Sequence, residues 1–397
     1  MACRSYEGGG KGPFDRLRAG EPLPYTRVQE ASHVRMNRRR FLKLGVAAAG
    51  AALSGGAGMV SCERQAKSPQ DAKPVALPRW RGFNLTEKFT VDRNRRFVER
   101  DFEWIAKWGF DFVRLPMDYR CYTDPGDWTA FREDGLREID EAVEFGKRYK
   151  IHVNLNLHRA PGYCVNPPPE PKDLFKDEEA LHVCARHWKN FAVRCKGIPN
   201  QRLSFNLLNE PGRTSEEDYA RVARHLIAAI READPDRLII ADGLRWAREP
   251  VLSLTDLGIG QSARGYDPMQ VSHYRAGWIR GSDEWREPTW PITDPQGRRW
   301  DKDALREHYR PWVELKRAGV GVHMGEMGAF NQTPHAVVLA WMKDLFSVLR
   351  ENEIGWALWN FRGSFGVVDS ERSDVEYENL SGGHKLDRAL LELLESG

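Results

Sequence analysis

The chain has 397 residues, of which 41% are hydrophobic and 29% charged, a composition typical of a folded protein that excludes a largely disordered one. The formal net charge is +3, but residues 1–62 hold ten Lys and Arg against four Asp and Glu, which leaves 50 against 53 in the remainder. A nearly balanced body without a basic stripe argues against nucleic acid and strongly anionic polysaccharides as partners, and favours a neutral one.

Residues 36–62 have the pattern of an export signal. The sequence Asn-Arg-Arg-Arg-Phe-Leu-Lys at residues 37–43 precedes an uncharged stretch, residues 44–60, that is rich in Ala and Gly. A membrane anchor is the alternative, but this stretch is too short and too weakly apolar to span a bilayer comfortably. We therefore expect a twin-arginine signal recognised by its translocase, with residues 1–35, upstream of Met36, as an over-called start.

Cys62 ends the apolar stretch in the order Met-Val-Ser-Cys, which resembles a lipidation site although Met59 is unusual three residues before the cysteine. Either Cys62 carries a lipid anchor or an ordinary signal peptidase cuts nearby. Residues 63–78 are polar and predict a short flexible linker, with one folded domain at 79–397. We expect an exported protein that is periplasmic, anchored to the membrane as a lipoprotein, or secreted.

From residue 79 onward, short apolar or β-branched segments alternate eight times with longer amphipathic segments. This alternation predicts a parallel sheet, and eight units favour the α/β architecture of a (β/α)8 TIM barrel. No G-x-G-x-x-G follows the first strand, which excludes a dinucleotide-binding fold. The expected strands are 81–85, 110–115, 151–157, 203–208, 238–241, 269–273, 321–326 and 355–359, and the expected helices are 98–108, 133–149, 178–195, 216–233, 303–318, 336–351 and 386–394, with a weak fifth helix near 250–254.

Polar and aromatic side chains stand at the ends of several expected strands, where a TIM barrel places its active site. Glu210 follows the fourth strand and Glu326 ends the seventh, so the two carboxylates can face each other across the barrel mouth. Cleavage of a glycosidic bond needs such a pair, one group as acid/base and the other as nucleophile. The other side chains at strand ends are Arg114, His158, Asn209, His273 and Trp359.

Over residues 79–397 the chain resembles glycoside hydrolase family 5. The matching segments are Arg81-Gly82-Phe83-Asn84, Arg114-Leu115-Pro116, His158, Asn209-Glu210-Pro211, His273, Glu326 and Trp359. The resemblance implies a retaining enzyme with Glu210 as acid/base and Glu326 as nucleophile.

The resemblance also implies supporting roles. Asn209 would hydrogen-bond the sugar 2-hydroxyl, and Arg114 would hold Glu326 and keep it ionised. Trp359 would offer its indole face to the apolar face of the sugar ring.

The sixth strand departs from the family pattern. His158 and His273 would line the subsite at the bond cleaved, and the family has a Tyr two residues after the strand-six His, touching the nucleophile. Here Arg275 holds that place and Tyr274 comes one residue earlier. Either the strand end is bulged, with Tyr274 as the candidate, or another group takes the role.

A metal site is the alternative interpretation of His158, His273, His323 and Glu326, as in amidohydrolase-like barrels. Those enzymes have a His-x-His pair on strand one, which this chain lacks, so we expect no metal and no other cofactor. His323, inside the seventh expected strand, is better explained as a structural histidine.

Two segments predict walls of a substrate site. Residues 275–301 are too long for an ordinary loop and contain Trp278, Trp285, Trp290 and Trp300. Residues 163–171, with four prolines, predict a stiff loop beside the barrel mouth.

Cys121 and Cys164 fall in the second and third expected βα loops, at one face of the barrel. Either they form a disulfide after export or they are free thiols. Cys184 and Cys195 are eleven residues apart on one expected helix and cannot bridge each other.

We therefore expect a retaining hydrolase of β-linked glycans, in the first place an endo-β-1,4-glucanase. A β-mannanase or an exo-acting β-glucosidase of the same family is an alternative, because subsite loops on a shared catalytic core decide the substrate. An alternative of another class is a non-catalytic carbohydrate-binding lipoprotein, against which the intact glutamate pair argues.

Overall fold

The computed structural model describes residues 75–397. The expected twin-arginine signal at 36–62, Cys62 as lipid anchor, and residues 63–74 of the expected linker lie outside the described residues. Among the described residues, no helix combines the length and the apolar character that a membrane crossing requires.

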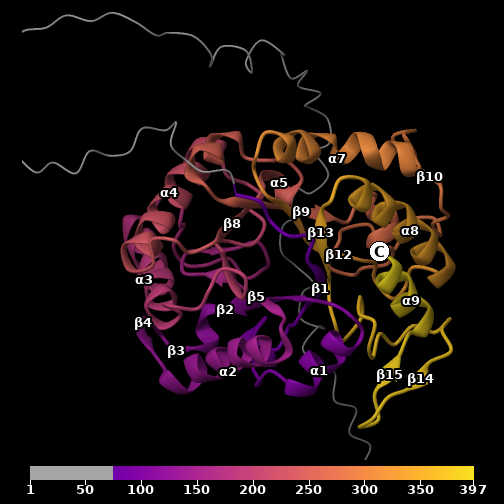
Figure 1. Ribbon diagram of the computed structural model, residues 1–397. Coiled ribbons are helices and arrows are strands. Elements are labelled where there is room, and N and C mark those ends of the chain that lie inside the picture. Colours follow the sequence, from indigo (N-terminus) through magenta and orange to yellow (C-terminus); the bar gives the residue numbers. More distant parts are fainter. Residues whose placement is uncertain (1–74) are drawn as a thin grey trace, which may run out of the picture. The chain divides into compact units, whose positions relative to one another are not determined.

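Eight parallel strands form a closed barrel (Figure 1). They are β1 (Arg81–Asn84), β2 (Phe112–Asp118), β5 (His152–Ala160), β7 (Leu203–Asn206), β8 (Ile239–Asp242), β9 (Gly260–Gly265), β12 (Val322–Met327) and β13 (Gly355–Leu358). Their hydrogen-bonded order is β2-β1-β13-β12-β9-β8-β7-β5, and β2 also pairs with β5, so the sheet closes on itself. The expected TIM barrel is confirmed.

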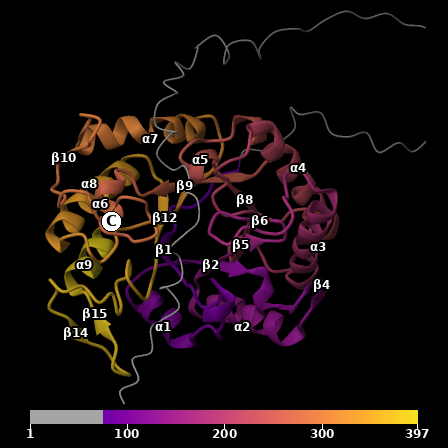
Figure 2. The same ribbon diagram turned by 180° about the vertical axis from the view of Figure 1, so that it is seen from behind.

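Helices surround the strands, as the two opposite views show (Figures 1 and 2). The longer ones are α1 (Glu99–Lys107), α2 (Glu133–Tyr149), α3 (Glu178–Arg194), α4 (Glu216–Ala233), α7 (Lys302–Arg317), α8 (His335–Glu351) and α9 (Arg388–Ser396). Between β8 and β9 stand only α5 (Leu244–Ala247) and a 3-10 helix (Leu252–Leu257), which accounts for the weak helical pattern near 250–254.

The loops contain short helices and strands. They are α6 (Met269–Ser272), 3-10 helices at Val91–Arg93 and Tyr119–Cys121, β6 (Tyr163–Cys164), which pairs with β5, and the antiparallel pairs β3 (Thr123–Asp124) with β4 (Asp127–Phe131), β10 (Ile292–Thr293) with β11 (Arg299–Trp300), and β14 (Glu378–Asn379) with β15 (Lys385–Leu386).

Side-chain caps fix the starts of several helices. Ser215 accepts a hydrogen bond from the backbone N–H of Asp218 at the start of α4 (3.1 Å), and Asp301 accepts one from Ala304 at the start of α7 (3.1 Å). Each cap satisfies an N–H group that has no partner inside its helix.

The sixth strand was predicted wrongly. It is β9, with the sequence Gly-Gln-Ser-Ala-Arg-Gly, whereas the expected strand at 269–273 contains α6. β9 is buried along its length although it lacks an apolar run, because its polar side chains find buried hydrogen-bond partners. Gln261, for example, exchanges two 2.8 Å hydrogen bonds with the backbone of Val251.

Aromatic rings and histidines fill the amino-terminal end of the barrel. Trp80 stacks on His152 with ring centroids 3.7 Å apart, and Phe112 lies 4.5 Å from His323. Burial lowers the pKa of His323 to about 3, so the ring is neutral. His323 therefore lies in the core, at the end of the barrel opposite the strand ends where the glutamates stand.

The cysteines of residues 75–397 are free thiols. Cys121 is buried and its Sγ donates to the backbone oxygen of Lys88 (3.5 Å), while Sγ of Cys164 donates to that of His158 (3.8 Å). Of the two alternatives for Cys121 and Cys164, the structure has the free thiols.

Candidate active site

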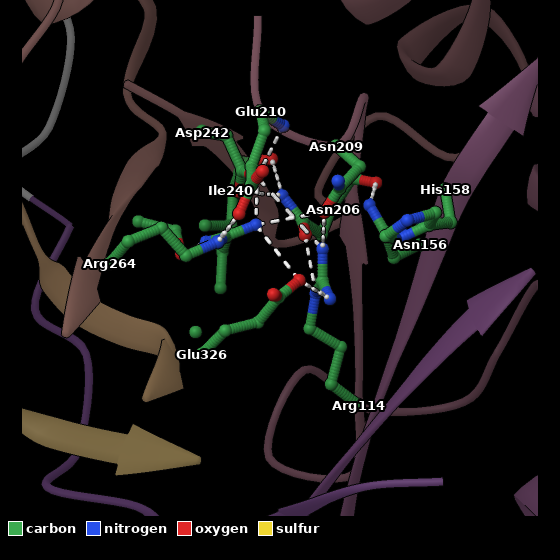
Figure 3. Close-up of polar contacts among 12 residues, drawn as sticks. Arg114, Asn156, His158, Asn206, Asn209, Glu210, Ile240, Asp242, Arg264 and Glu326 are labelled. Carbon is green, nitrogen blue, oxygen red and sulfur yellow. Dashed lines mark hydrogen bonds and ion pairs between the residues drawn. The ribbon is translucent and has the colours of Figure 1, made fainter. Parts of the chain in front are cut away.

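Glu210 and Glu326 come together at the carboxyl ends of the strands, on either side of one guanidinium group (Figure 3). Glu210 stands four residues after the end of β7, and Glu326 lies within β12. Nε of Arg264 donates to Oε1 of Glu210 (2.7 Å), and Nη2 of Arg264 lies 3.2 Å from Oε1 of Glu326. The pair expected from the sequence is thus assembled, with an arginine between its members.

Arg114 organises the side of the site next to Glu326. It is 1% exposed, and its Nη1 donates to Oε1 of Glu326 (2.6 Å). Its remaining donors bind the side-chain oxygens of Asn84 (3.0 Å), Asn206 (2.9 Å) and Asn209 (2.8 Å). These hydrogen bonds hold the guanidinium of Arg114 in one orientation, and the guanidinium in turn orients Oε1 of Glu326.

Asp242, at the end of β8, joins the two halves of the site. It is fully buried; Oδ1 accepts from Asn206 Nδ2 (2.8 Å), and Oδ2 accepts from the backbone N–H of Glu210 (3.0 Å) and from Arg264. Glu210 has a φ of 50°, in the left-handed region that a glutamate rarely adopts. The hydrogen bond that the backbone N–H of Glu210 donates to Asp242 helps to hold that strained backbone in place.

The structure corrects the tyrosine at the nucleophile. Tyr266, just after β9, donates a 3.0 Å hydrogen bond to Oε2 of Glu326. Tyr274 is buried under the guanidinium of Arg275, which lies 5.0 Å from its ring centre, and Tyr274 has no hydrogen bond to Glu326 among the described residues. Because the sixth strand ends eight residues earlier than predicted, the family's Tyr position falls on Tyr266 and its His position on Arg264.

His273 lies beside the site rather than at a strand end. It is the C-cap of α6, its ring meets the edge of Tyr266 at 5.1 Å, and its Nδ1 is 2.7 Å from Ser272 Oγ. Burial is the main reason that its pKa falls to about 3. His273 is therefore a neutral packing partner of the tyrosine that binds Glu326.

His158 and Trp359 form a third part of the site. The ring of His158, near the end of β5, stacks on Trp359 with centroids 5.7 Å apart, and Phe89 packs against both. Nε2 of His158 is 3.1 Å from Nδ2 of Asn166, in the proline-rich loop. Burial, followed by the charge of Arg114, lowers the pKa of His158 well below its usual range, so the ring is neutral.

Two buried polar atoms of this site have no hydrogen-bond partner in the described part of the chain. They are Nδ2 of Asn209 and Nδ1 of His158. Buried polar groups in native proteins are almost always paired, so these two atoms mark places where a polar ligand would bind.

The two glutamates differ in their electrostatic environment. Burial, and then the negative charge of Glu326, raise the pKa of Glu210 to about 7. Oε1 of Glu326 is bound by Arg114 and Oε2 by Tyr266, so donors face both of its oxygens. The arrangement suits Glu210 to carry a proton near neutral pH and Glu326 to be ionised.

Three of the four tryptophans of the 275–301 segment divide into two groups. Trp278 is 59% exposed and lies edge-on to Phe330, with ring centroids 4.9 Å apart, and to His273 (6.2 Å). Trp300 is 5% exposed, and Nε1 of Trp290 donates to Asp344 of α8 (2.9 Å), so both of these anchor the segment. Trp278 alone of these three offers an open indole beside the site.

Within residues 75–397, no group of three or more His, Cys, Asp or Glu side chains is arranged to hold a metal ion. Besides Tyr266, the sequence interpretation missed Asp242 and Arg264 as site residues. Asp242 could have been found, because it ends the apolar run Leu-Ile-Ile-Ala at a strand terminus, as Asn209 and Glu210 follow theirs. Arg264 gave no comparable pattern.

Comparison with known proteins agrees with this geometry. Residues 70–364 match the family described as Cellulase (glycosyl hydrolase family 5). Endoglucanase C of Acetivibrio thermocellus is 26% identical over 306 residues, 71% of this chain and 89% of the relative, and cellodextrinase A of Ruminococcus flavefaciens is 27% identical over 287 residues, 67% and 79% respectively.

Solved structures share the fold. The crystal structure of a glycoside hydrolase is 38% identical, superposes with a TM-score of 0.76, and covers 80% of this chain and 99% of that one. An endoglucanase of Thermotoga maritima, 23% identical with a TM-score of 0.65 over 79% of this chain and 96% of its own, shows the same barrel. The chain belongs to glycosyl hydrolase family 5, the cellulase family, and is a glycoside hydrolase.

Proposed function

We propose that the chain is a retaining endo-β-1,4-glucanase in which Glu326 is the nucleophile and Glu210 the acid/base. The observation that carries this division of roles is the unequal surroundings of the two carboxylates. Both oxygens of Glu326 face hydrogen-bond donors, whereas Glu210 accepts one side-chain hydrogen bond, at Oε1, within the described residues. Oε2 of Glu210 is left to carry the proton that the leaving group needs.

The reaction then follows from these positions. Glu326 attacks the anomeric carbon while Glu210 gives its proton to the glycosidic oxygen. The bond between the anomeric carbon and that oxygen breaks, the aglycon departs as an alcohol, and a glycosyl–Glu326 ester remains. Glu210, now ionised, takes a proton from a water molecule, whose oxygen attacks the anomeric carbon and frees Glu326. Two inversions leave the configuration at the anomeric carbon unchanged.

The unpaired polar atoms support a sugar at this place. Nδ2 of Asn209 is positioned to donate to a sugar hydroxyl beside the reacting carbon, and Nδ1 of His158 to a second one. The partly exposed indole of Trp359 supplies an apolar surface for the sugar ring. No step in this scheme requires a metal or another cofactor.

The substrate rests on similarity and on charge. Relatives named as endoglucanases and a cellodextrinase match most of the chain, which favours β-1,4-glucan. A neutral polymer also suits the balanced charge of residues 63–397.

Product analysis tests the proposal. Purified enzyme is incubated with cello-oligosaccharides, manno-oligosaccharides and β-1,3-glucan, and the products and their initial anomeric form are followed by chromatography and NMR. Internal cleavage of cello-oligosaccharides with β-anomer released first is the expected result. Release of single glucose units from one end would establish the exo alternative, and preference for mannan the mannanase.

A Glu326→Gln variant separates enzyme from binder. It should lose hydrolysis while it still binds cello-oligosaccharides in calorimetry, whereas Glu217→Gln, an exposed glutamate of α4, should match the wild type. Sugar binding by a wild type that turns over none of the substrates would leave the carbohydrate-binding lipoprotein as the answer.

We also propose that residues 36–62 direct export by the twin-arginine route and that 79–397 is the catalytic domain. The support is the Arg-Arg-Arg-Phe-Leu-Lys sequence before an uncharged stretch. A fusion of residues 36–62 to a reporter should be exported, and Arg38→Lys with Arg39→Lys should retain it in the cytoplasm. Incorporation of labelled palmitate that disappears in Cys62→Ala would show the lipid anchor, and its absence would leave a cleaved signal.

A further inference from the structure

Arg264 introduces a permanent positive charge between the two catalytic glutamates. It is 2% exposed, it contacts Glu210 and Glu326, and it also donates to Asp242 (Figure 3). The resemblance to the family places a histidine at this position, two residues before the tyrosine that touches the nucleophile. A histidine can be neutral, but an arginine cannot, so the site needs a compensating negative charge.

Asp242 provides that charge. Two arginines, Arg114 and Arg264, face three carboxylates, those of Glu210, Asp242 and Glu326. With every carboxylate ionised the cluster has one net negative charge, and with one carboxyl protonated it has none. Because an uncompensated buried charge is costly, the cluster favours the state with a single proton.

The hydrogen bonds indicate which of the three carboxyl groups binds the proton. Both oxygens of Asp242 accept from N–H donors, and both oxygens of Glu326 face donors as well. A protonated carboxyl would turn one of these contacts into a clash between two donors. Glu210 uses Oε1 only, for Arg264, so a proton on its Oε2 disturbs no bond of the described residues.

We propose that Arg264 and Asp242 are a coupled positioning pair: Arg264 holds the two catalytic glutamates beside each other, and Asp242 offsets its charge so that Glu210 retains the proton. The inference rests on the proposed roles of Glu210 and Glu326 and adds two residues that set their protonation. Arg264 alone would favour the ionised, inactive form of the acid.

The groups around Glu210 come from each neighbouring strand. Arg264 of β9 and Arg114 of β2 favour its ionised form, while Asp242 of β8 and Glu326 of β12 favour the protonated one. The neutral hydroxyls of Tyr266 and Tyr163 complete the set, and Tyr163 donates to the backbone oxygen of Glu210 (2.7 Å). The charge of Asp242 acts on the pKa of Glu210 in the upward direction and that of Arg264 in the downward direction.

The test compares pH profiles of kcat/KM for the intact chain and three variants, on the cello-oligosaccharide that the wild type cleaves fastest. Asp242→Asn should move the basic limb, where Glu210 loses its proton, to lower pH by about one unit, and Arg264→Met should move it to higher pH by a similar amount. The double variant should return toward the wild-type position. Opposite shifts cannot result from loss of structure alone.

Arg264→Lys separates charge from geometry. Lysine retains the positive charge but not the fork, so the basic limb should stay within about half a unit of the wild type while kcat falls by about 10-fold or more. If Arg264→Met does not fold, this variant and Asp242→Asn still decide the question.

Asp234→Asn is the matched control. Asp234 pairs with the 1%-exposed Arg237 at 2.6 Å, beyond the end of α4 and outside the active site. It should lower Tm without moving either limb of the profile. Folded Asp242→Asn and Arg264→Met variants whose basic limbs stay in place, or shift in the same direction, would overturn the inference. A wild type that hydrolyses no glycan would instead defeat the proposed function.

Discussion

Tyr266 donates a 3.0 Å hydrogen bond to Oε2 of Glu326, on the oxygen opposite the one that Arg114 holds. Each oxygen of the Glu326 carboxylate therefore accepts a hydrogen bond, and the two bonds together fix the plane of the carboxylate. The backbone oxygen of Tyr266 in turn accepts from the hydroxyl of Ser272, at the end of α6. The tyrosine is part of a rigid chain of contacts rather than a mobile surface group.

Replacing this tyrosine should damage catalysis specifically. Tyr266→Phe removes one hydrogen bond to a charged group, worth about 1.5–3 kcal/mol, so kcat/KM should fall by about 10- to 100-fold. Tyr274→Phe is the control, because Tyr274 is buried away from Glu326, and its kcat/KM should change less than about twofold. Steady-state kinetics on one cello-oligosaccharide measure both. A larger loss from Tyr274→Phe would return the role to that residue.

The barrel could be predicted because its periodicity is carried by apolar residues in most strands. Phe112–Asp118 and His152–Ala160 contain alternating or continuous apolar positions, and Glu210 and Glu326 follow recognisable strands. The rule that strand ends form the active site then placed both glutamates without any view of the fold.

The sixth strand could not be predicted from local sequence. The residues of β9 fit their neighbours on other strands. Position 265 has room for glycine only, because a Cβ there would lie 2.4 Å from Sδ of Met324. Arg264 can be buried because carboxylates from other segments pair with its charge. These are contacts between segments far apart in the chain, which a window of sequence does not contain. The error displaced the tyrosine assignment from Tyr266 to Tyr274.

The pKa of Glu210 sets the alkaline side of activity. Burial and Glu326 raise it to about 7 from the ordinary value near 4.5, and the acid must be protonated to assist departure of the leaving group. Activity should therefore fall about tenfold for each pH unit above 7. The measurement is kcat/KM against pH. A basic limb above pH 9 or below pH 5 would contradict the assignment of Glu210 as the acid.

The same shift makes a prediction about stability. A carboxyl whose pKa is raised on folding binds its proton more tightly in the folded state, so stability is lost as pH rises from about 4.5 to 7. Glu210→Gln, which cannot ionise, should escape this loss. The Tm of the variant relative to the wild type should thus rise between pH 5 and pH 8. A constant difference in Tm would show that Glu210 titrates alike in both states.

The proline-rich loop is expected to depend on a buried ion pair. Arg159 and Glu170 are 5% and 4% exposed, and Tyr119 also donates to Glu170 (2.9 Å). Glu170→Ala removes an ion-pair partner of the buried Arg159 guanidinium and should lower the free energy of unfolding by about 3–5 kcal/mol. The loss is smaller to the extent that Asp118, whose Oδ2 lies 3.6 Å from Nε of Arg159, compensates the charge. Urea unfolding measures the loss.

The control for this loop is Lys172→Ala, whose ion pair with Glu179 lies on the surface and should leave stability unchanged. Equal stability of both variants would contradict the anchoring role of Glu170. Because Asn166 of the same loop contacts His158, the Glu170 variant should also raise KM.

Trp278 and Trp300 should separate substrate binding from folding within one segment. Trp278 is 59% exposed and lies beside His273, so Trp278→Ala should change Tm by less than about 2 °C. The value of kcat/KM for long cello-oligosaccharides should fall by about 5- to 30-fold, because the variant loses an aromatic surface worth about 1–2 kcal/mol. The loss should shrink as the oligosaccharide is shortened, because a short chain does not reach the indole.

Trp300 supplies the contrast. It is 5% exposed, its Nε1 donates to Asp294 (3.0 Å), and the guanidinium of Arg298 lies 4.0 Å from its ring centre. Trp300→Ala should cost about 3–5 kcal/mol of stability through the cavity that it leaves. Kinetics of Trp278→Ala that equal the wild type for every chain length would mean that the segment packs against the barrel without touching substrate, and the specificity would then lie in the loops around Trp359.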